Sequence, residues 1–435
     1  MKKNSKKTIQ GWIFYDWANS VYSLVVSTAV FPTFYNSVTA SAGADLVSFF
    51  GIGIRNSVLY EYSLSFSFLL IAALAPLLSG VADYGGKRKF FMKFFTYLGS
   101  LSCIALVFFT GPNVEYGIIC AVLASAGFSG SLVFYNSYLP VIATPNLYDR
   151  ISAKGFAMGY AGSLILLTVC LALIMNGEAL GFSDATLAPR LSFVLVGLWW
   201  AGFAQITFNR LPRNASRATG GGEGLLTKGY QEILAIWKRI KTMKHLKRFI
   251  LAFFLFNTGV QTVIYLASLF GGKVLNMPAE KLILTILLIQ AVAIAGSHLF
   301  AALSTARGNR FSLQVLILVW AMVCVAAFFI ATEIHFFVLA FIVGLVMGGI
   351  QSLSRSTYSK FIPPDTDDHT SFFSFYDVTE KISLVMGTLA YGLVDHITGS
   401  MRLSSLTLAV FFIAGFAVLS RVKVPYSGDS QSQAR

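Results

Sequence analysis

The residues best suited to chemistry in this chain are ionisable side chains that interrupt long apolar stretches. Asp16 is one of them, and Asp377, Glu380 and Lys381 form a second group. A charge inside a hydrocarbon layer is costly, so an ionisable residue there is a functional candidate that needs a partner. Such residues can carry a proton, hold a charged solute or neutralise one another.

The second group has the spacing of a helix face. Asp377 and Lys381 are four residues apart, so they share a face and can neutralise each other. Lys381 lies about 10 residues, roughly 15 Å, inside the apolar stretch that we expect at 371–395. Lys381 is therefore either a counter-ion for Asp377, Glu380 or Asp16, or a contact for a substrate carboxylate.

Asp16 heads a polar stripe in the first apolar stretch. Asn19 and Ser20 follow it at helical spacing, and Tyr22 lies close by. Asp16 itself lies about five residues, roughly 8 Å, from the expected helix start at residue 11. Polar groups in hydrocarbon cost several kcal/mol unless they are satisfied, so this face is expected to meet a wet interior. Asp16 either serves as a proton-coupling site or pairs with a cation for structural reasons.

Polar stripes of this kind recur in three more apolar stretches. They either line a central cavity or hydrogen-bond neighbouring helices, a contact worth about 0.6 kcal/mol each. Arg355 lies near the end of its stretch, where it could instead snorkel to the membrane surface. The stripes comprise Ser125, Ser129, Tyr135 and Asn136; Asn257, Gln261, Tyr265 and Ser268; and Gln351, Ser354, Arg355 and Tyr358.

The elements that must position these residues are membrane-spanning helices. The chain is 56% hydrophobic and only 12% charged, and a helix needs roughly 20 apolar residues to cross a bilayer. We therefore predict an all-α polytopic membrane protein with twelve transmembrane helices in two pseudo-symmetric six-helix bundles. The expected spans are 11–37, 60–82, 90–110, 114–138, 150–176, 190–209, 248–271, 282–304, 311–331, 334–359, 371–395 and 403–420.

The formal charge of +14 reflects topology rather than nucleic-acid binding. Most of the 33 Lys and Arg fall in loops on one side, which the positive-inside rule assigns to the cytoplasm together with both termini. The exceptions are Arg55, Arg190, Lys273, Lys281, Arg402 and Lys381, the last of which lies within an expected span. The four cysteines have no zinc or disulfide spacing, and we expect no metal and no cofactor.

One hydrophilic stretch divides the chain. We predict an N-terminal bundle over 1–210, a cytoplasmic linker over 211–247, a C-terminal bundle over 248–424 and a disordered tail over 425–435. The linker should contain a basic amphipathic helix on the membrane surface. The two halves contain similar short motifs at similar positions. Gly86-Lys87-Arg88 corresponds to Gly308-Asn309-Arg310, and Asn136-Ser137-Tyr138 corresponds to Ser356-Thr357-Tyr358. The number of residues between the two members is nearly the same for both pairs. Two parallel six-helix repeats are typical of secondary transporters.

The most specific motif joins the second and third spans. The string Gly80-Val-Ala-Asp83-Tyr-Gly-Gly86-Lys87-Arg88 resembles the signature loop of the major facilitator superfamily. The resemblance implies that Asp83 contacts the N-terminus of the eleventh helix, near Ser371–Ser374, and that this contact closes the cytoplasmic side as a latch. The alternative is that the motif is only a turn in a basic loop, without a gating role. Thr305 stands where the second half would need an aspartate, so the latch is expected to be one-sided.

A second resemblance narrows the family. Tyr15-Asp16-Trp17-Ala18-Asn19-Ser20, Phe256-Asn257-Thr258-Gly259 and Phe375-Tyr376-Asp377 are similar to motifs of fungal vacuolar amino-acid effluxers and their bacterial relatives. Thr258 departs from the pattern, because an acidic residue is expected there. The resemblance implies export of small solutes, with amino acids favoured.

We therefore expect a secondary active transporter, not an enzyme, that exports a small solute by alternating access, with proton coupling as one option. The alternatives are a cation-coupled sugar permease of the same fold and a non-transporting membrane receptor. The expected partners are a small molecule, protons and the lipid bilayer, without nucleic acid, and the expected state is a monomer. The expected location is the inner cell membrane, or the vacuolar membrane in a fungus.

Overall fold

Twelve helical crossings make up the part of the chain that the structure describes. The computed structural model describes residues 3–39, 46–182, 184–213 and 225–426. Most of the predicted disordered tail and the Gly-rich part of the linker lie outside these ranges. Nine helices of the described part are by themselves long and apolar enough to cross a membrane. One of the nine makes two crossings, and the two remaining crossings are the first helix and the eleventh, both interrupted by polar residues.

The first half of the chain forms six crossings. The first is α1 (Lys6–Val21), which continues through the π-helical η1 (Tyr22–Val30) into α2 (Phe31–Thr39). It begins five residues earlier than predicted, so Asp16 lies about ten residues, roughly 15 Å, from its start and not 8 Å. The others are α3 (Asn56–Tyr84), α4 (Arg88–Ala105), α5 (Val114–Asn136), α7 (Tyr148–Met175) and α8 (Leu187–Arg210), with the short α6 (Leu139–Ile142), η2 (Leu106–Phe108) and η3 (Pro145–Leu147) between them.

The second half repeats the pattern. Its crossings are α10 (Lys244–Leu275), the two arms of α11 (Ala279–Phe329), α12 (Glu333–Phe361), α13 (His369–Thr398) and α14 (Met401–Leu419). The arms of α11 correspond to the predicted eighth and ninth spans, and they meet at Gly308, whose φ of 79° breaks the helix. Glycine adopts this left-handed conformation at little cost, so the chain reverses direction there in a single residue.

Helix ends follow local chemistry. The hydroxyl of Thr332 accepts a hydrogen bond from the backbone N–H of His335 and caps α12. Asn276 and Gly399, both left-handed, end α10 and α13. One element was not predicted: strands β1 (Leu46–Phe49) and β2 (Ile52–Arg55) form an antiparallel hairpin between α2 and α3.

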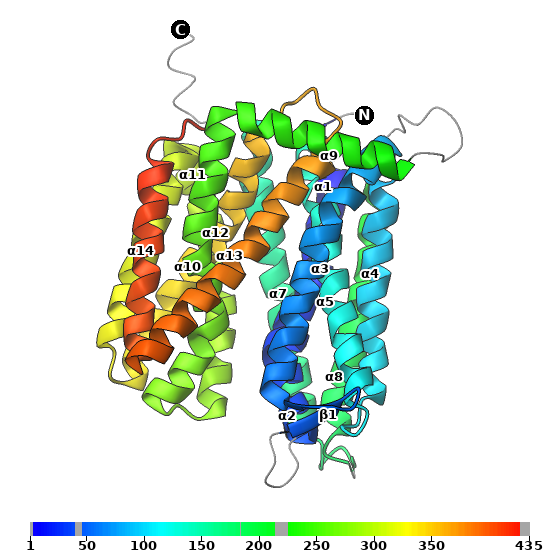
Figure 1. Ribbon diagram of the computed structural model, residues 1–435, viewed down its shortest axis with the longest axis vertical. Helices are drawn as coiled ribbons and strands as arrows, with labels where there is room; N and C mark the ends of the chain where they lie inside the picture. The colour runs from blue at the N-terminus through cyan, green and yellow to red at the C-terminus, as the bar shows by residue number, and fades with distance from the viewer. Residues whose placement is uncertain (1–2, 40–45, 183, 214–224, 427–435) are drawn as a thin grey trace.

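The two halves fold as two bundles that stand side by side (Figure 1). Each has its own hydrophobic core, with Trp12 and Trp200 in the first and Trp320 and Phe412 in the second. Small residues bring helices close together: a Cβ on Gly348 would meet the backbone of α11 at Ala293. Close backbone contact of this kind is how helices associate in lipid, where burial of apolar surface drives little.

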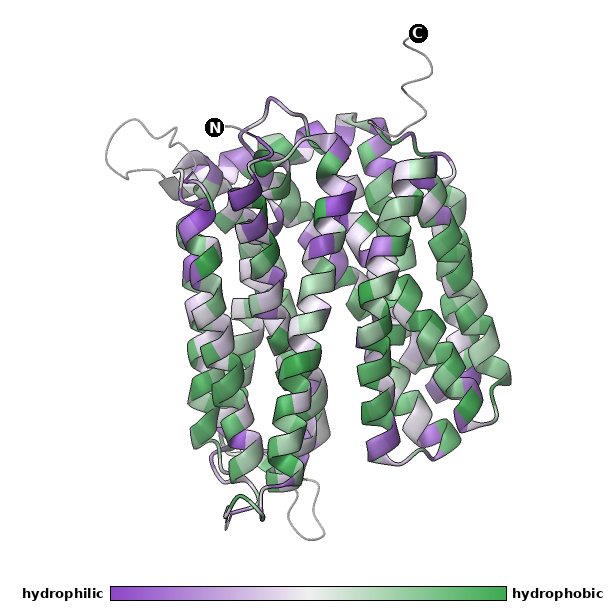
Figure 2. Cartoon of the chain, turned by 180° about the vertical axis from the view of Figure 1, so that it is seen from behind, coloured by the Kyte–Doolittle hydropathy of each residue, from purple (hydrophilic) through white to green (hydrophobic). Residues whose placement is uncertain are grey.

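One end of the molecule is marked by charge, and we call it the basic end. There α1 begins, α14 ends, and α9 (Leu225–Thr242) lies across both bundles (Figure 1). Hydrophilic residues gather at this end, whereas apolar residues cover the middle of the helices (Figure 2). The helix α9 is the predicted amphipathic helix of the linker. The β-hairpin lies at the opposite end (Figure 1).

Candidate functional site

Asp16 forms an ion pair that joins the two bundles. Its Oδ2 lies 3.1 Å from Nη2 of Arg355 on α12, and the hydroxyl of Tyr135 donates to the same oxygen at 2.8 Å. Both charged side chains are almost fully buried. Arg355 therefore does not snorkel, and the cation that pairs with Asp16 is Arg355 rather than Lys381.

Arg355 is held on every side. Its guanidinium donates to the hydroxyl and the carbonyl oxygen of Ser152 on α7, at 2.9 and 3.0 Å, and to Oδ1 of Asn136 at 3.3 Å. It also lies over the rings of Trp12 and Phe156, at 4.7 and 4.2 Å from the centroids. A buried ion pair is stable only when its remaining hydrogen-bonding groups are satisfied, and Tyr135, Ser152 and Asn136 supply such bonds here.

Two glycines on α7 make room for this pair. A Cβ on Gly155 would collide with the Asp16 carboxylate and the Arg355 guanidinium, and one on Gly159 would collide with the hydroxyl of Ser20. The Gly155–Gly159 pair therefore serves the polar contact as well as close helix packing. We call Asp16, Arg355 and their partners the central pair.

The motif residue Asp83 lies at the N-terminus of α13. Its carboxylate accepts hydrogen bonds from the backbone N–H groups of Thr370 and Ser371, at 3.3 and 2.7 Å. Arg88 lies 3.1 Å from the same carboxylate and donates to the Thr370 hydroxyl at 2.7 Å. A helix N-terminus favours an anion, so this contact, which we call the first latch, joins α3 and α4 to α13.

A second contact of the same kind joins α7 to the C-terminal bundle. Asp149, in the first turn of α7, pairs with Nζ of Lys360 at 2.8 Å. Asn309 and Ser304, on either side of the Gly308 break, donate to its carboxylate at 2.7 and 3.0 Å. We call this group the second latch.

The prediction of a one-sided latch is therefore wrong. The second half does lack an aspartate at Thr305, but the first turn of the opposing helix α7 supplies the carboxylate instead. Sequence reasoning missed Asp149, Lys360 and Asn309 as a site because they come from three segments that are distant in the chain. The sequence did offer one signal: the carboxylate of Asp149 lies in the first turn of a helix that faces the loop resembling the motif in the second half.

The charged cluster on α13 is less tightly paired. Nζ of Lys381 lies 3.8 Å from Asp377 and 4.0 Å from Glu380, and it lies over the ring of Phe68 on α3. Oδ2 of Asp377 is buried without a hydrogen-bond partner among the described residues. The cluster holds two acids and one base, so it carries a net negative charge when all three are ionised.

The remaining predicted residues divide between contacts and packing. Asn257 donates to the hydroxyl of Ser383 on α13 at 2.5 Å, and Gln351 accepts from Tyr160 across the bundles at 2.6 Å. Gln261 lies next to Asn257, 3.5 Å away. Tyr22 packs on Phe128 and Trp200 inside the first core, Asn19 is buried beside Ser20, and Tyr265 is 41% exposed.

Three further residues singled out in the sequence have local roles. Thr258, where an acid was expected, is buried, and its hydroxyl donates to the carbonyl of Phe254 within α10. Gly86 has a φ of 65°, which the tight turn between α3 and α4 requires. Lys87 is exposed in that turn.

Comparison with solved structures places the fold in the major facilitator superfamily. The chain superposes with a TM-score of 0.70 on the transporter FucP in its outward conformation, over 95% of this chain and 97% of that one, at 14% identity. It superposes with a TM-score of 0.68 on the human organic anion transporter MFSD10 (TETRAN), over 95% and 98%, at 15% identity. At these identities the likeness concerns the fold alone.

The sequence comparisons identify the family within this fold. The model of the family "Vacuole effluxer Atg22 like" matches residues 4–431, so the chain belongs to that family. The MFS-type transporter YxiO of Bacillus subtilis is 31% identical, over 100% of this chain and 99% of its own length. The autophagy-related protein 22 of Yarrowia lipolytica is 26% identical, over 85% of this chain and 76% of its own length. The chain is thus a multi-pass membrane transporter for a small molecule and not an enzyme.

Proposed function

We propose that this transporter exports a small solute, with amino acids as the substrate class, by alternating access of one central site to the two sides of the membrane. The observation that carries the proposal is the set of contacts between the bundles. The central pair and both latches lie in the half of the molecule nearer the basic end. They hold that end shut, and transport requires that they break in turn.

The orientation of this closed end follows from its charge. Lys6, Lys7 and the cations of α9 and of the turn at Lys87 all lie at the basic end. The positive-inside rule places such loops in the cytoplasm, together with both termini. The membrane is then the inner membrane of a bacterium or the vacuolar membrane of a fungus, and the state described here is closed on the cytoplasmic side. One chain holds both bundles, so a monomer suffices.

The cluster on α13 suits a zwitterion. Its ion pairs, at 3.8 and 4.0 Å, are longer than a hydrogen-bonded pair. Lys381 can turn to a substrate carboxylate, while Glu380 or Asp377 receives the ammonium group. Asn257 and Gln261 on α10 supply neutral hydrogen-bonding groups beside the cluster. A sugar would make no use of this charge separation.

Asp16 suits the role of a proton acceptor that controls the central pair. As a carboxylate, Asp16 forms an ion pair with Arg355 of the other bundle. As a neutral acid, it binds Arg355 only weakly. Removing one member of a buried ion pair costs about 3–5 kcal/mol, so a proton on Asp16 favours the state in which water reaches Arg355. Proton binding and opening of the basic end are coupled in this way.

Transport by purified protein in liposomes tests the proposal. Labelled amino acids are expected to exchange across the membrane, and a pH gradient is expected to drive their accumulation. Lys381→Met should abolish exchange, whereas Lys423→Met, at an exposed position, should not. Asp16→Asn should abolish accumulation and leave exchange. Flux of labelled sugars but not of amino acids would favour the sugar permease, and flux of neither would contradict the proposal.

A further inference from the structure

The linker helix α9 contacts both bundles. Near its start it crosses the end of α3, where a Cβ on Gly80 would collide with the backbone of Gly229. Farther along, Ile236 and Ile240 are buried in the core of the C-terminal bundle. Only Met243 separates α9 from α10, so this second part of α9 must move with the C-terminal bundle.

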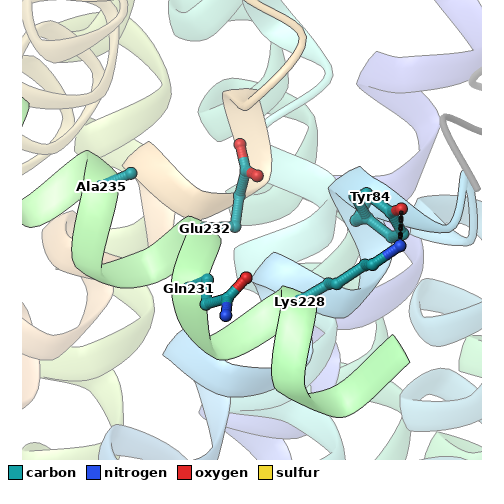
Figure 3. A pocket seen from close by; sticks show the side chains of 5 residues that line it. All are labelled: Tyr84, Lys228, Gln231, Glu232 and Ala235. Carbon is teal, nitrogen blue, oxygen red and sulfur yellow. Dashed lines mark hydrogen bonds between the residues drawn. The ribbon is translucent and has the colours of Figure 1, made fainter. Parts of the chain in front are cut away.

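Side chains strengthen both contacts. Lys228 donates to the hydroxyl of Tyr84 at 2.9 Å, beside a shallow pocket that Gln231, Glu232 and Ala235 also line (Figure 3). On the other side, Trp237 stacks on Phe375 of α13, with the centroids 5.5 Å apart. The helix α9 therefore spans the line along which the bundles must part when the basic end opens. The glycine at position 80 of the motif serves this crossing and not the turn that follows.

A third face of α9 is largely exposed, with Trp237 at its edge next to Phe375. Tyr230, Leu234 and Trp237 are 57%, 41% and 44% exposed, and their spacing places them along one stripe. Lys238 and Lys241 are exposed beside the stripe. Tyr and Trp favour the level of the lipid headgroups, and a basic amphipathic helix binds a surface of anionic lipid.

We propose that α9 docks on anionic phospholipid headgroups of the cytoplasmic leaflet and that the docked helix straps the basic end shut. The inference rests on the proposed alternating access, which it extends to regulation by lipid. A ligand shifts a conformational equilibrium only if it binds one state better than the other. When the C-terminal bundle tilts to open the basic end, α9 tilts with it, and the Gly229 part of the helix must leave both α3 and the membrane surface.

Distance measurement in lipid nanodiscs tests the proposal. Spin labels at Phe90 and Arg310, both exposed at the basic end of opposite bundles, report whether that end is closed. Adding phosphatidylglycerol to phosphatidylcholine should increase the fraction of short distances. In Lys238→Gln/Lys241→Gln the ratio of closed to open molecules in phosphatidylglycerol should fall roughly five-fold or more. Lys6→Gln/Lys7→Gln, which removes the same charge elsewhere at this end, should leave it unchanged.

A second label locates the helix itself. A spin label at Leu234 should be more accessible to oxygen than to a water-soluble nickel complex when phosphatidylglycerol is present. Accessibility to nickel in every lipid would overturn the docking and would point to a soluble acidic partner for the same face. If sodium phosphate increases the fraction of short distances as much as phosphatidylglycerol does, the anion that α9 binds does not come from the membrane.

The strap has its own control. Gly229→Ala should open the basic end in either lipid, because the added Cβ pushes α9 off α3, whereas Gly202→Ala, at a glycine with open space around it, should not. If the short and long distances of the closed and open states keep the same proportion in every lipid and variant, the strap is refuted, and the proposal of alternating access is unaffected. A single short distance under all conditions would contradict alternating access, while the label at Leu234 would still decide the docking.

Discussion

The two latches close the same end of the molecule by opposite arrangements. In the first, the carboxylate of Asp83 belongs to the motif, and the facing helix α13 offers backbone N–H groups. In the second, the facing helix α7 provides the carboxylate of Asp149, and the motif copy provides the donors Ser304 and Asn309. The halves keep the position of the contact, but the carboxylate comes from the motif in one and from the facing helix in the other. We therefore expect closure of the basic end to depend on a charged contact at each of these two positions.

The second latch is expected to be the stronger of the two. Its carboxylate is paired with a buried lysine at 2.8 Å and receives two more hydrogen bonds. Lys360→Met leaves Asp149 buried without a cation, at a cost of about 3–5 kcal/mol to the closed state. We expect this variant to open the basic end. The measurement is the alkylation rate of Ser352→Cys by an impermeant reagent added from that side, in a chain without the four buried cysteines.

A double variant is the control for this prediction. Asp149→Asn/Lys360→Met removes both charges, and replacing a whole buried pair is often close to neutral. Alkylation should therefore return toward that of the parent chain. If Lys360→Met alkylates as slowly as the parent, the second latch does not hold the basic end.

Asp83→Asn tests the first latch. The amide still accepts one hydrogen bond from α13 but loses its charge, and Arg88 keeps its hydrogen bond to the Thr370 hydroxyl. Hydrogen bonds to charged groups contribute about 1.5–3 kcal/mol, so we expect faster alkylation of Ser352→Cys, with a smaller effect than that of Lys360→Met. Glu61→Gln, at an exposed position on the same helix α3, is the matched control. An effect larger than that of Lys360→Met would reverse the order of the two latches.

Thr305→Asp tests whether the missing aspartate matters. Thr305 is exposed, and its hydroxyl bonds the carbonyl of Ala301 in its own helix. An added carboxylate there remains in solvent, so we expect a change in closure below about 0.5 kcal/mol. A strong stabilisation of the closed state would show that the motif position itself, rather than Asp149, carries the latch of the second half.

The sequence predicted the helices well because most crossings are long apolar runs with clear ends, and only the first and the eleventh are interrupted by polar residues. The predicted spans differ from the helices by a few residues, and the largest error, at the start of α1, arose because Lys6 and Lys7 belong to the helix. The β-hairpin was missed because each strand has only four residues, too few for a periodicity to be recognised.

Residue spacing alone predicted the site only where its members share one helix, whereas the contact of Asp83 with the start of α13 was predicted from the family resemblance. Asp377 and Lys381 were correctly paired, since four residues separate them. For Arg355, the sequence left open whether it joins the polar stripe of its helix or snorkels to the surface. The structure turns it inward to Asp16, which is far away in the chain. Contacts between bundles depend on how the bundles face each other, and no periodicity along one segment contains that information.

A reversible cross-link between the bundles tests the central claim most directly. The hydroxyls of Ser137 and Thr370 lie 3.4 Å apart across the closed basic end, so cysteines at both positions can form a disulfide in this state. In a chain without the native cysteines, oxidation of Ser137→Cys/Thr370→Cys should abolish amino-acid exchange in liposomes, and reduction should restore it. Undiminished exchange by fully cross-linked protein would contradict the account.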